Sequence, residues 1–278
     1  MSVAEIIRAH RDVPWGRIEF EQRPPNRAGF EYRAYHVVGL DGRRTRCVSV
    51  TTFLGALAKP ALLDWREDMG AQGALEAERS GALAGVSVED AADWLRANGM
   101  DAGTRAREAA RRGVDVHEVL ENYLSTGEAP NPADHPADHR GYIRGLVRWL
   151  LWAERHGLEV EATERLVAHP ELRYAGRLDL RARLHGLSRV IDLKTNRHGR
   201  VWDDHHFQPV AYAVADEACG AEPVHDCLIV AVGPDGSFEQ MRACSDPADF
   251  MAVLDMYRRL ARLRADVKAE RERLEAAA

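Results

Sequence analysis

The sequence predicts an α/β protein in which helices surround a short antiparallel meander of strands. Three consecutive segments, at 159–169, 174–184 and 188–196, have the composition of strands and are separated by turn formers. Two longer segments before them, at about 101–124 and 135–156, repeat apolar residues at helical spacing. Because the breaks between the three strand segments are short, we expect neighbouring strands to pair antiparallel.

The first 50 residues predict a small β-meander or hairpin. RIEFEQ, FEYRAYHVV and TRCVSV alternate aromatic or β-branched residues with others, and RPPNRAG and GLDGR between them are turn sequences. From Thr51 the pattern becomes helical, and a short helix bounded by glycines follows within residues 81–100. We therefore expect an N-terminal β-meander and helical extension at 1–100 and a core at 101–278, packed as one compact unit.

Beyond the meander the sequence predicts a helix at about 202–218, two strands at 225–233 and 237–244, and a long C-terminal helix at 246–274. Apolar residues of that last helix recur at close to helical spacing: Phe250, Val253, Tyr257, Leu260, Val267 and Leu274. Such a stripe is typical of a helix packed on the core, which we favour, or of an oligomerisation coil.

Composition excludes several classes of protein. The chain has 278 residues, of which 45% are hydrophobic and 29% charged, as in an ordinary soluble globular protein. No apolar run approaches the roughly 20 residues of a membrane span, and the N-terminus lacks the pattern of a signal peptide. We therefore expect a cytoplasmic protein without a membrane partner. The net charge of −6 gives no global electrostatic case for nucleic-acid binding, so basic groups must be judged locally.

The four cysteines favour neither a disulfide framework nor a structural zinc site. Their spacings are wide and contain no CxxC: Cys47, Cys219, Cys227 and Cys244. We interpret them as buried thiols.

The stretch VIDLKTNRHGR contains the residue most out of character for this chain. Only three of the 38 basic residues are lysines, Lys59, Lys194 and Lys268. In a strand, residues two apart share a face, so Asp192 and Lys194 are presented together. Asp179 lies on the preceding predicted strand, after Gly176, and the two aspartates converge if these strands pair.

Two converging carboxylates are the ligands that a hard cation such as Mg²⁺ or Mn²⁺ prefers. Lysine differs from arginine because its compact ammonium can lose a proton when its pKa is shifted, whereas a guanidinium stays charged. Two roles are open for Lys194: it orients an attacking water, or it offsets negative charge that develops on a phosphodiester.

Two further pairs have helical i, i+4 spacing and therefore lie on one face each. Gln208 and Tyr212 follow the meander on the next predicted helix, where their polar tips can hold a phosphate or a base. His117 and Glu121 lie on the long upstream helix, and His117 offers an imidazole ligand to a metal. Neither pair is specific by itself.

The order of these motifs resembles the PD-(D/E)XK nuclease superfamily, in particular its RecB-like, phage-type exonuclease branch, which includes CRISPR adaptation nucleases and phage recombination exonucleases. The resemblance covers residues 104–242 and rests on the ordered set His117, Glu164, GRLD (Gly176 to Asp179), DLK (Asp192 to Lys194), Gln208 and Tyr212. It implies a restriction-endonuclease-like core of helix, three-strand antiparallel meander, helix and strand.

The resemblance also implies roles for these residues. Asp179 and Asp192 bind the metal with help from His117, Lys194 is the catalytic lysine, and Gln208 and Tyr212 support the substrate. Glu164 either contacts the site or only braces its strand, and Glu121 is a possible supporting residue.

Two features depart from the family pattern. Many members have threonine where this chain has Arg177, which we expect to add a phosphate contact. Several relatives bind an iron–sulfur cluster through one cysteine before the core and three clustered cysteines after it. Cys47 can play the first part, but no clustered trio follows, so we predict no iron–sulfur cluster.

We therefore expect a Mg²⁺- or Mn²⁺-dependent DNA nuclease, and an exonuclease in preference to an endonuclease, acting in DNA recombination, repair or phage DNA processing. The alternatives are a structure- or sequence-specific endonuclease and a catalytically inactive DNA-binding protein that keeps the nuclease fold. DNA contacts are expected from arginines: Arg105, Arg111, Arg112, Arg173, Arg197 and Arg200. A single-strand annealing or recombination protein is a second possible partner. Polarity, strand preference, the number of metal ions and the oligomeric state stay open.

Overall fold

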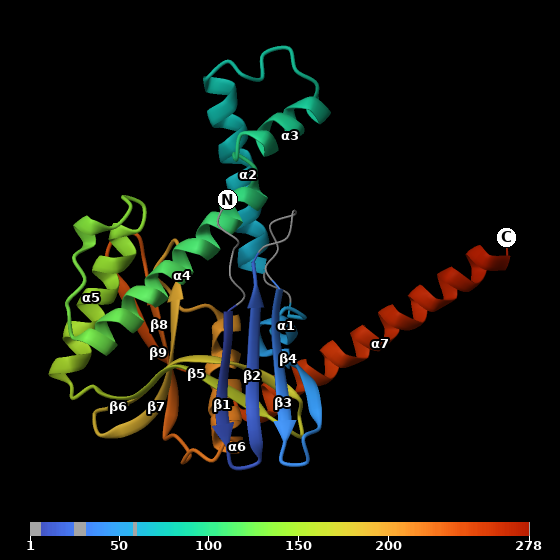
Figure 1. Ribbon diagram of the computed structural model, residues 1–278. Coiled ribbons are helices and arrows are strands. Elements are labelled where there is room, and N and C mark those ends of the chain that lie inside the picture. The colour runs from blue at the N-terminus through green and yellow to red at the C-terminus, as the bar shows by residue number, and fades with distance from the viewer. Residues whose placement is uncertain (1–6, 25–31, 58–59, 278) are drawn as a thin grey trace.

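The fold is a mixed α/β arrangement around one nine-stranded open sheet (Figure 1). The computed structural model describes residues 7–24, 32–57 and 60–277. Most of the predicted turn RPPNRAG, and also Lys59, lie outside the described residues.

The sheet has the order β1-β2-β3-β4-β6-β7-β8-β9, and β5 pairs with β6 beside this path. Its strands are β1 (Ile7–Val13), β2 (Gly16–Arg23), β3 (Tyr32–Gly39), β4 (Arg44–Ser49), β5 (Glu159–His169), β6 (Tyr174–Leu184), β7 (Leu187–Thr195), β8 (Asp226–Val232) and β9 (Phe238–Arg242). The helices are α1 (Val50–Leu54), α2 (Pro60–Arg79), α3 (Val88–Ala97), α4 (Ala102–Thr126), α5 (Arg140–Arg155), α6 (Phe207–Ala218) and α7 (Pro247–Ala277). Two 3₁₀ turns, Pro132–Asp134 and Asp203–His206, precede α5 and α6.

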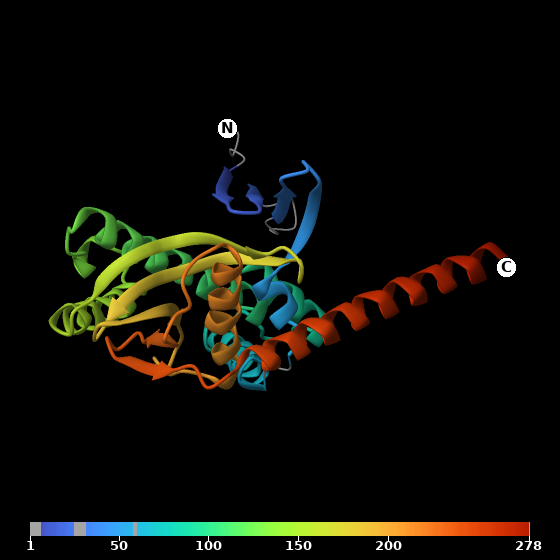
Figure 2. The same ribbon diagram turned by 90° about the horizontal axis from the view of Figure 1, so that it is seen from below.

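The N-terminal meander is confirmed and has four antiparallel strands, β1 to β4. Its apolar inner face, which includes Ile18, Phe20 and Tyr35, packs on Leu166 and Ala175 of β5 and β6 (Figure 2). β4 then joins β6 in parallel, and this short pairing makes the two parts one continuous sheet. The N-terminal meander thus packs on β5 and β6 with its apolar face and is joined to β6 through its last strand, β4.

The central meander β5–β6–β7 is antiparallel, as the short breaks predict. β8 pairs parallel to β7, and α6 is the crossover between them. Successive side chains of β8 point to opposite faces of the sheet. Cys227 and Ile229 pack in a cluster with α1, α6 and α7, whereas Leu228 and Val230 pack with α4 and α5. The sheet is therefore covered by α6 on one face and by α4 and α5 on the other.

Two helix starts differ from the sequence prediction. The helix expected from 135 begins at Arg140, because the preceding residues form the 3₁₀ turn Pro132–Asp134 and a further turn. The helix expected from 202 begins as the 3₁₀ turn Asp203–His206 and becomes α-helical at Phe207. Within the described residues, no helix is long and apolar enough to cross a lipid bilayer.

Helix α7 packs on the body only at its start. Phe250, Val253 and Leu254 are buried, whereas Val267 and Leu274 are 42% and 59% exposed. The rest of the helix projects away from the molecule (Figures 1 and 2). The prediction that the whole helix packs on the core is therefore wrong beyond its first turns, because no element in the described part of the chain covers the helix there.

Candidate active site

The candidate site lies where β6 and β7 part. Their regular pairing ends at Leu180 and Ile191, and the next opposed residues are Asp179 and Asp192. Oδ2 of Asp179 instead accepts a hydrogen bond from the backbone N–H of Leu193 at 2.8 Å. The carboxylate thus takes the place of a main-chain acceptor, and both aspartates are held at the fork between the strands.

The side-chain alternation of β6 shifts at Asp179. Leu178 packs in the cluster beneath α6, but Leu180, two residues on, packs in the cluster of α4 and α5. A regular strand would place both on one face. The shift turns Asp179 toward α4, while Asp192 on β7 stays with Lys194 and α6.

Glu164 on β5 has a conformation that a strand residue rarely adopts. Its φ is 44°, in the left-handed region, where a non-glycine residue stores strain of about 1–3 kcal/mol. The regular pairing of β5 with β6 skips it, although Thr163 and Arg165 on either side are paired. This local distortion places the Glu164 carboxylate beside His117.

His117 on α4 faces the two carboxylates with one ring nitrogen. Nε2 lies 3.0 Å from the carbonyl oxygen of Leu193, which can only accept, so Nε2 carries the proton. Nδ1 lies 3.6 Å from Asp179 Oδ1 and 3.7 Å from Glu164 Oε1. Among the described residues, these three form the one group of potential ligands close enough to share a metal ion.

In the neutral imidazole, Nδ1 is an acceptor that faces two acceptors. Such an arrangement is stable only if Nδ1 is protonated or a cation lies between the groups. Burial lowers the pKa of His117, but Asp179 and Glu164 outweigh it and raise the pKa to about 9. For Asp179, burial acts in the opposite direction and raises the pKa to about 6, although the nearby His117 opposes this shift. Without a metal the group therefore holds a proton in the place where a cation fits.

A chain of polar contacts continues from Asp192 into α6. Lys194 Nζ lies 2.7 Å from Asp192 Oδ2 and donates to Gln208 Oε1 at 3.1 Å. The Gln208 amide donates to the Tyr212 hydroxyl at 3.1 Å. The Tyr212 ring lies against the backbone of Gly176, where a Cβ atom would come within 2.5 Å of it. The missing side chain of Gly176 thus leaves room for the Tyr212 ring.

Lys194 is a cation in this environment. Burial lowers its pKa, but the carboxylates of Asp192 and Asp179 have the larger combined effect and raise it above the ordinary value. The arrangement therefore favours a lysine that supplies charge over one that acts as a base.

Asp192 has unused bonding capacity. It is 1% exposed, and within the described structure its close polar partner is the Lys194 ammonium, 2.7 Å from Oδ2, while Oδ1 accepts no hydrogen bond. A buried carboxylate of this kind is costly unless a cation compensates it. Its surplus of lone pairs and the group around His117 fit a hard divalent cation held by carboxylate oxygens and one imidazole.

Of the remaining predicted residues, one contacts the ligand group of His117, Asp179 and Glu164, and the others lie outside it. Arg177 contacts Glu164 at 3.4 Å, and its guanidinium lies 4.9 Å from the centre of the Phe20 ring. Glu121 is exposed on α4 and does not belong to the ligand group. Sequence reasoning missed Phe20, because nothing in the sequence indicates that β2 lies over β6.

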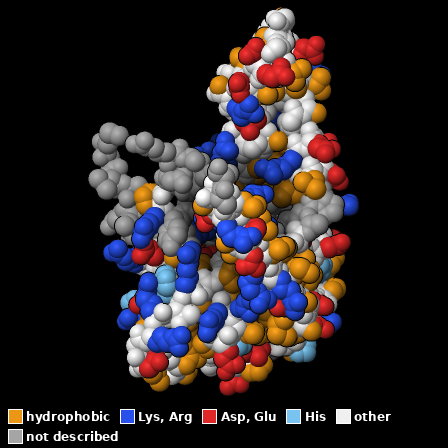
Figure 3. All heavy atoms as spheres, turned by 90° about the vertical axis from the view of Figure 1, so that its right-hand side faces the viewer, with side chains coloured by type: hydrophobic (Ala, Val, Ile, Leu, Met, Phe, Trp, Pro, Cys, Tyr) orange, Lys and Arg blue, Asp and Glu red, His pale blue; other side chains and the backbone are white. Residues whose placement is uncertain are grey.

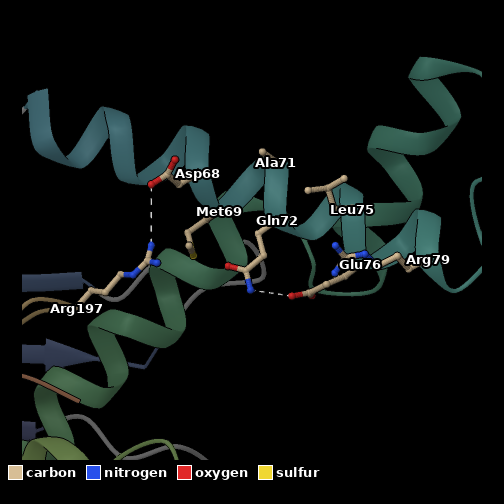
Figure 4. A pocket seen from close by; sticks show the side chains of 8 residues that line it. All are labelled: Asp68, Met69, Ala71, Gln72, Leu75, Glu76, Arg79 and Arg197. Carbon is tan, nitrogen blue, oxygen red and sulfur yellow. Dashed lines mark hydrogen bonds and ion pairs between the residues drawn. The ribbon is translucent and has the colours of Figure 1, made fainter. Parts of the chain in front are cut away.

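Arg197 lies outside the ligand group, at a cavity of about 400 Å³ beside α2. Its guanidinium is 4.0 Å from the Asp68 carboxylate (Figure 4). On the same wall, Gln72 donates to Glu76 at 2.8 Å. These two pairs occupy four of the polar side chains that line the cavity, and the predicted DNA contact of Arg197 stays a prediction.

The cysteines lie apart from the site. Cys47 and Cys219 pack beneath the N-terminal meander and Cys227 packs beneath α6. The interpretation of all four cysteines as buried thiols is wrong for Cys244, which is exposed. Burial raises the pKa of Cys47 to about 11 and that of Cys227 to about 12. These buried thiols are inert toward ordinary thiolate chemistry, and the absence of an iron–sulfur cluster stays a prediction.

Comparison with known proteins adds no family. No family model matches the chain, and no curated protein matches it. Among solved structures, the crystal structure of SSO0001 is similar at 19% identity over 55% of this chain and 71% of that chain, with a TM-score of 0.29. A similarity this low carries no argument about fold or function.

Proposed function

We propose that this chain is a divalent-metal-dependent DNA nuclease that hydrolyses phosphodiester bonds, with Mg²⁺ or Mn²⁺ as the metal. One observation carries the proposal. Nδ1 of His117 faces the carboxylates of Asp179 and Glu164 at 3.6 and 3.7 Å, next to a buried Asp192 that is paired with a lysine. A metal group with an adjacent ammonium is an arrangement that stabilises a phosphodiester under attack.

In this proposal, His117, Asp179 and Glu164 hold the metal, and Asp192 completes the negative surface beside them. The bound metal would neutralise charge on the phosphate and lower the pKa of a coordinated water. Lys194 stays protonated, is held by Asp192 and Gln208, and presents positive charge to the scissile phosphate. Arg177, 35% exposed and anchored at Glu164, adds a phosphate contact.

Exonuclease action is the first choice within this class, and it rests on the motif order described above. A structure- or sequence-specific endonuclease would use the same residues. The inactive DNA-binding alternative is less well supported, because a protein that has lost catalysis has no need of a strained Glu164 and a buried Asp192 paired with a partly buried Lys194.

One assay separates the three possibilities. End-labelled linear DNA and closed circular DNA, each single- and double-stranded, are incubated with the purified chain and Mn²⁺. We expect release of short products from linear DNA and none from circles. Cutting of closed circles would replace the exonuclease by an endonuclease, and no cleavage of any substrate would refute the enzyme proposal.

A further inference from the structure

Helix α7 leaves the body after its first three turns. Phe250 and Leu254 are buried, and Arg258 donates a hydrogen bond to the carbonyl oxygen of Leu172, so the start of the helix is anchored. Every residue from Ala261 to Ala276 is exposed. This C-terminal arm, residues 259–276, points away from the sheet in both views (Figures 1 and 2). It is about 25 Å long at the rise of an α-helix.

The arm and the turn of α7 just before it carry an apolar seam at heptad spacing. Its members alternate in steps of four and three residues, with Glu270 at the one polar position: Met256, Leu260, Leu263, Val267, Glu270 and Leu274. Met256, Leu263 and Leu274 are each more than half exposed. A seam of this spacing is the a and d pattern of a two-stranded coiled coil. No described element of the chain covers it.

The charges of the arm indicate what covers the seam. Residues 259–264 contain Arg259, Arg262 and Arg264 and no acid, whereas residues 265–276 contain four acids and three bases. In a parallel pair the arginine-rich stretches would face each other and repel. In an antiparallel pair each arginine-rich stretch faces the half of the other copy that holds the acids. Figure 3 shows basic and acidic side chains interspersed on the face from which α7 projects.

We propose that the C-terminal arm pairs with the same arm of a second copy as an antiparallel two-stranded coiled coil. The register with the best match places Leu263 of one copy opposite Val267 of the other, and Met256 opposite Leu274. Leu260 then faces Glu270, whose carboxylate comes beside Arg259 and Arg264 of the other copy. Glu270 is 53% exposed in the single chain, where it contacts Arg273 of its own helix, so it is free to turn. The pairing does not depend on the proposed nuclease function.

The mass of the full chain in solution tests the pairing. We expect light scattering after size exclusion, from about 1 to 100 µM, to show a dimer of the 31.0 kDa chain that dissociates on dilution. Leu263→Asp with Val267→Asp places charges in the seam and should leave a monomer throughout. The control, Ala265→Asp with Ala269→Asp, adds the same charges off the seam and should stay dimeric. Circular dichroism verifies that both variants keep their helix content.

A charge swap tests the orientation. Glu270→Arg should weaken the dimer at least tenfold, and Arg264→Glu added to it should restore the affinity, because those two residues meet only in the antiparallel pair. A monomeric wild-type chain, or a dimer that survives the two seam aspartates, would refute the proposal. A dimer that needs the seam but is not restored by the swap would refute the antiparallel arrangement.

Discussion

Lys194 contacts two polar side chains at once from a largely buried position. Its Nζ lies 2.7 Å from Asp192 Oδ2 and 3.1 Å from Gln208 Oε1, and its side chain is 20% exposed. An ammonium is compact and its three donors rotate freely, whereas a guanidinium is planar and rigid. This geometry gives a physical reason for a lysine in a chain that otherwise uses arginine.

We expect Lys194→Arg to lower the rate of DNA cleavage by at least about 100-fold, because the planar group cannot reach Asp192 and the phosphate together. Initial rates on end-labelled duplex DNA with Mn²⁺ measure the effect. Lys268→Arg is the matched control, since Lys268 is 78% exposed on α7 and should tolerate the change. A Lys194→Arg variant with the wild-type rate would overturn the role given to this lysine.

Glu164 and Glu121 provide a second matched pair. The sequence offered both as supporting carboxylates, but Glu164 contacts His117 and Glu121 is exposed. We expect Glu164→Gln to raise the dissociation constant for Mn²⁺ at least about tenfold, because the amide is a much weaker ligand. Glu121→Gln should leave it unchanged. Calorimetric titration with Mn²⁺ measures both, and equal affinities of the two variants would remove Glu164 from the ligand set.

The pKa of His117 predicts how metal binding depends on pH. Nδ1 can bind a metal only after the imidazolium loses its proton, and the neighbouring carboxylates raise the pKa of His117 to about 9. Affinity for Mn²⁺ should therefore rise by about tenfold per pH unit from pH 7 and level off above pH 9, since each ion displaces one proton. Below about pH 6, Asp179 also takes up a proton and affinity falls faster. Titrations at pH 7, 8 and 9 measure the slope. An affinity for Mn²⁺ that is the same at all three pH values would exclude Nδ1 as a ligand.

At the scale of elements, α6 determines how the site is supported. Its residues Gln208, Tyr212 and Asp216 recur every four positions and lie on one face. The first contacts Lys194 and the second packs on Gly176. The third is fully buried and pairs with arginines of three strands: Arg11, Arg165 and Arg181. One helix thus joins Lys194 to the fork of the sheet and to the N-terminal strands.

Gly176→Ala tests the packing of α6 on β6. The added Cβ would lie 2.5 Å from the Tyr212 ring, which must shift and carry Gln208 with it. We expect a loss of about 1–3 kcal/mol in the free energy of unfolding, together with a lower cleavage rate. Gly70→Ala on α2 meets no neighbour within 4 Å and should instead stabilise the chain slightly. Urea unfolding compares the two, and an unchanged stability of Gly176→Ala would show that α6 can move freely at this contact.

At the scale of the whole molecule, Asp216 joins the N-terminal meander, β1 to β4, to the core. Arg11 of β1 donates to the Asp216 carboxylate at 3.0 Å and to the Leu166 carbonyl oxygen at 2.8 Å. Burying this charge is costly, so the pairing by itself is not a source of net stability. Its contribution is to specificity, because Asp216 and its arginine partners are each satisfied only when the N-terminal strands and the core are packed together.

Asp216→Asn should therefore destabilise the whole molecule. The change leaves buried Arg181 and its neighbours without their shared anion, and we expect a loss of about 3–5 kcal/mol in the free energy of unfolding. Asp255→Asn breaks an exposed pair with Arg259 and should change it by less than about 1 kcal/mol. Urea titration followed by circular dichroism measures both. If Asp216→Asn unfolded in two separate transitions, the N-terminal sheet and the core would be independent units rather than one.

The order of strands and helices was predictable because periodicity and turn residues are local signals. The antiparallel meander, the N-terminal strands and the pairing of Asp192 with Lys194 followed from them. Residue spacing also singled out His117, Gln208 and Tyr212, but it did not say which atoms they would meet. Helix starts were less predictable, since the 3₁₀ turns before α5 and α6 carry no strong sequence signal.

The sequence by itself determined the elements and the chemical groups available to this protein. Only the tertiary structure decided that Glu164, rather than Asp192, joins His117 and Asp179, that Arg197 lies elsewhere, and that most of α7 is uncovered. The reason is that these facts depend on contacts between distant residues. A left-handed glutamate in a strand is enforced by its surroundings and not by its own preference. Likewise, an apolar stripe predicts that a helix buries one face, and the three-dimensional arrangement shows that the described part of the chain leaves this face of α7 open beyond its first turns.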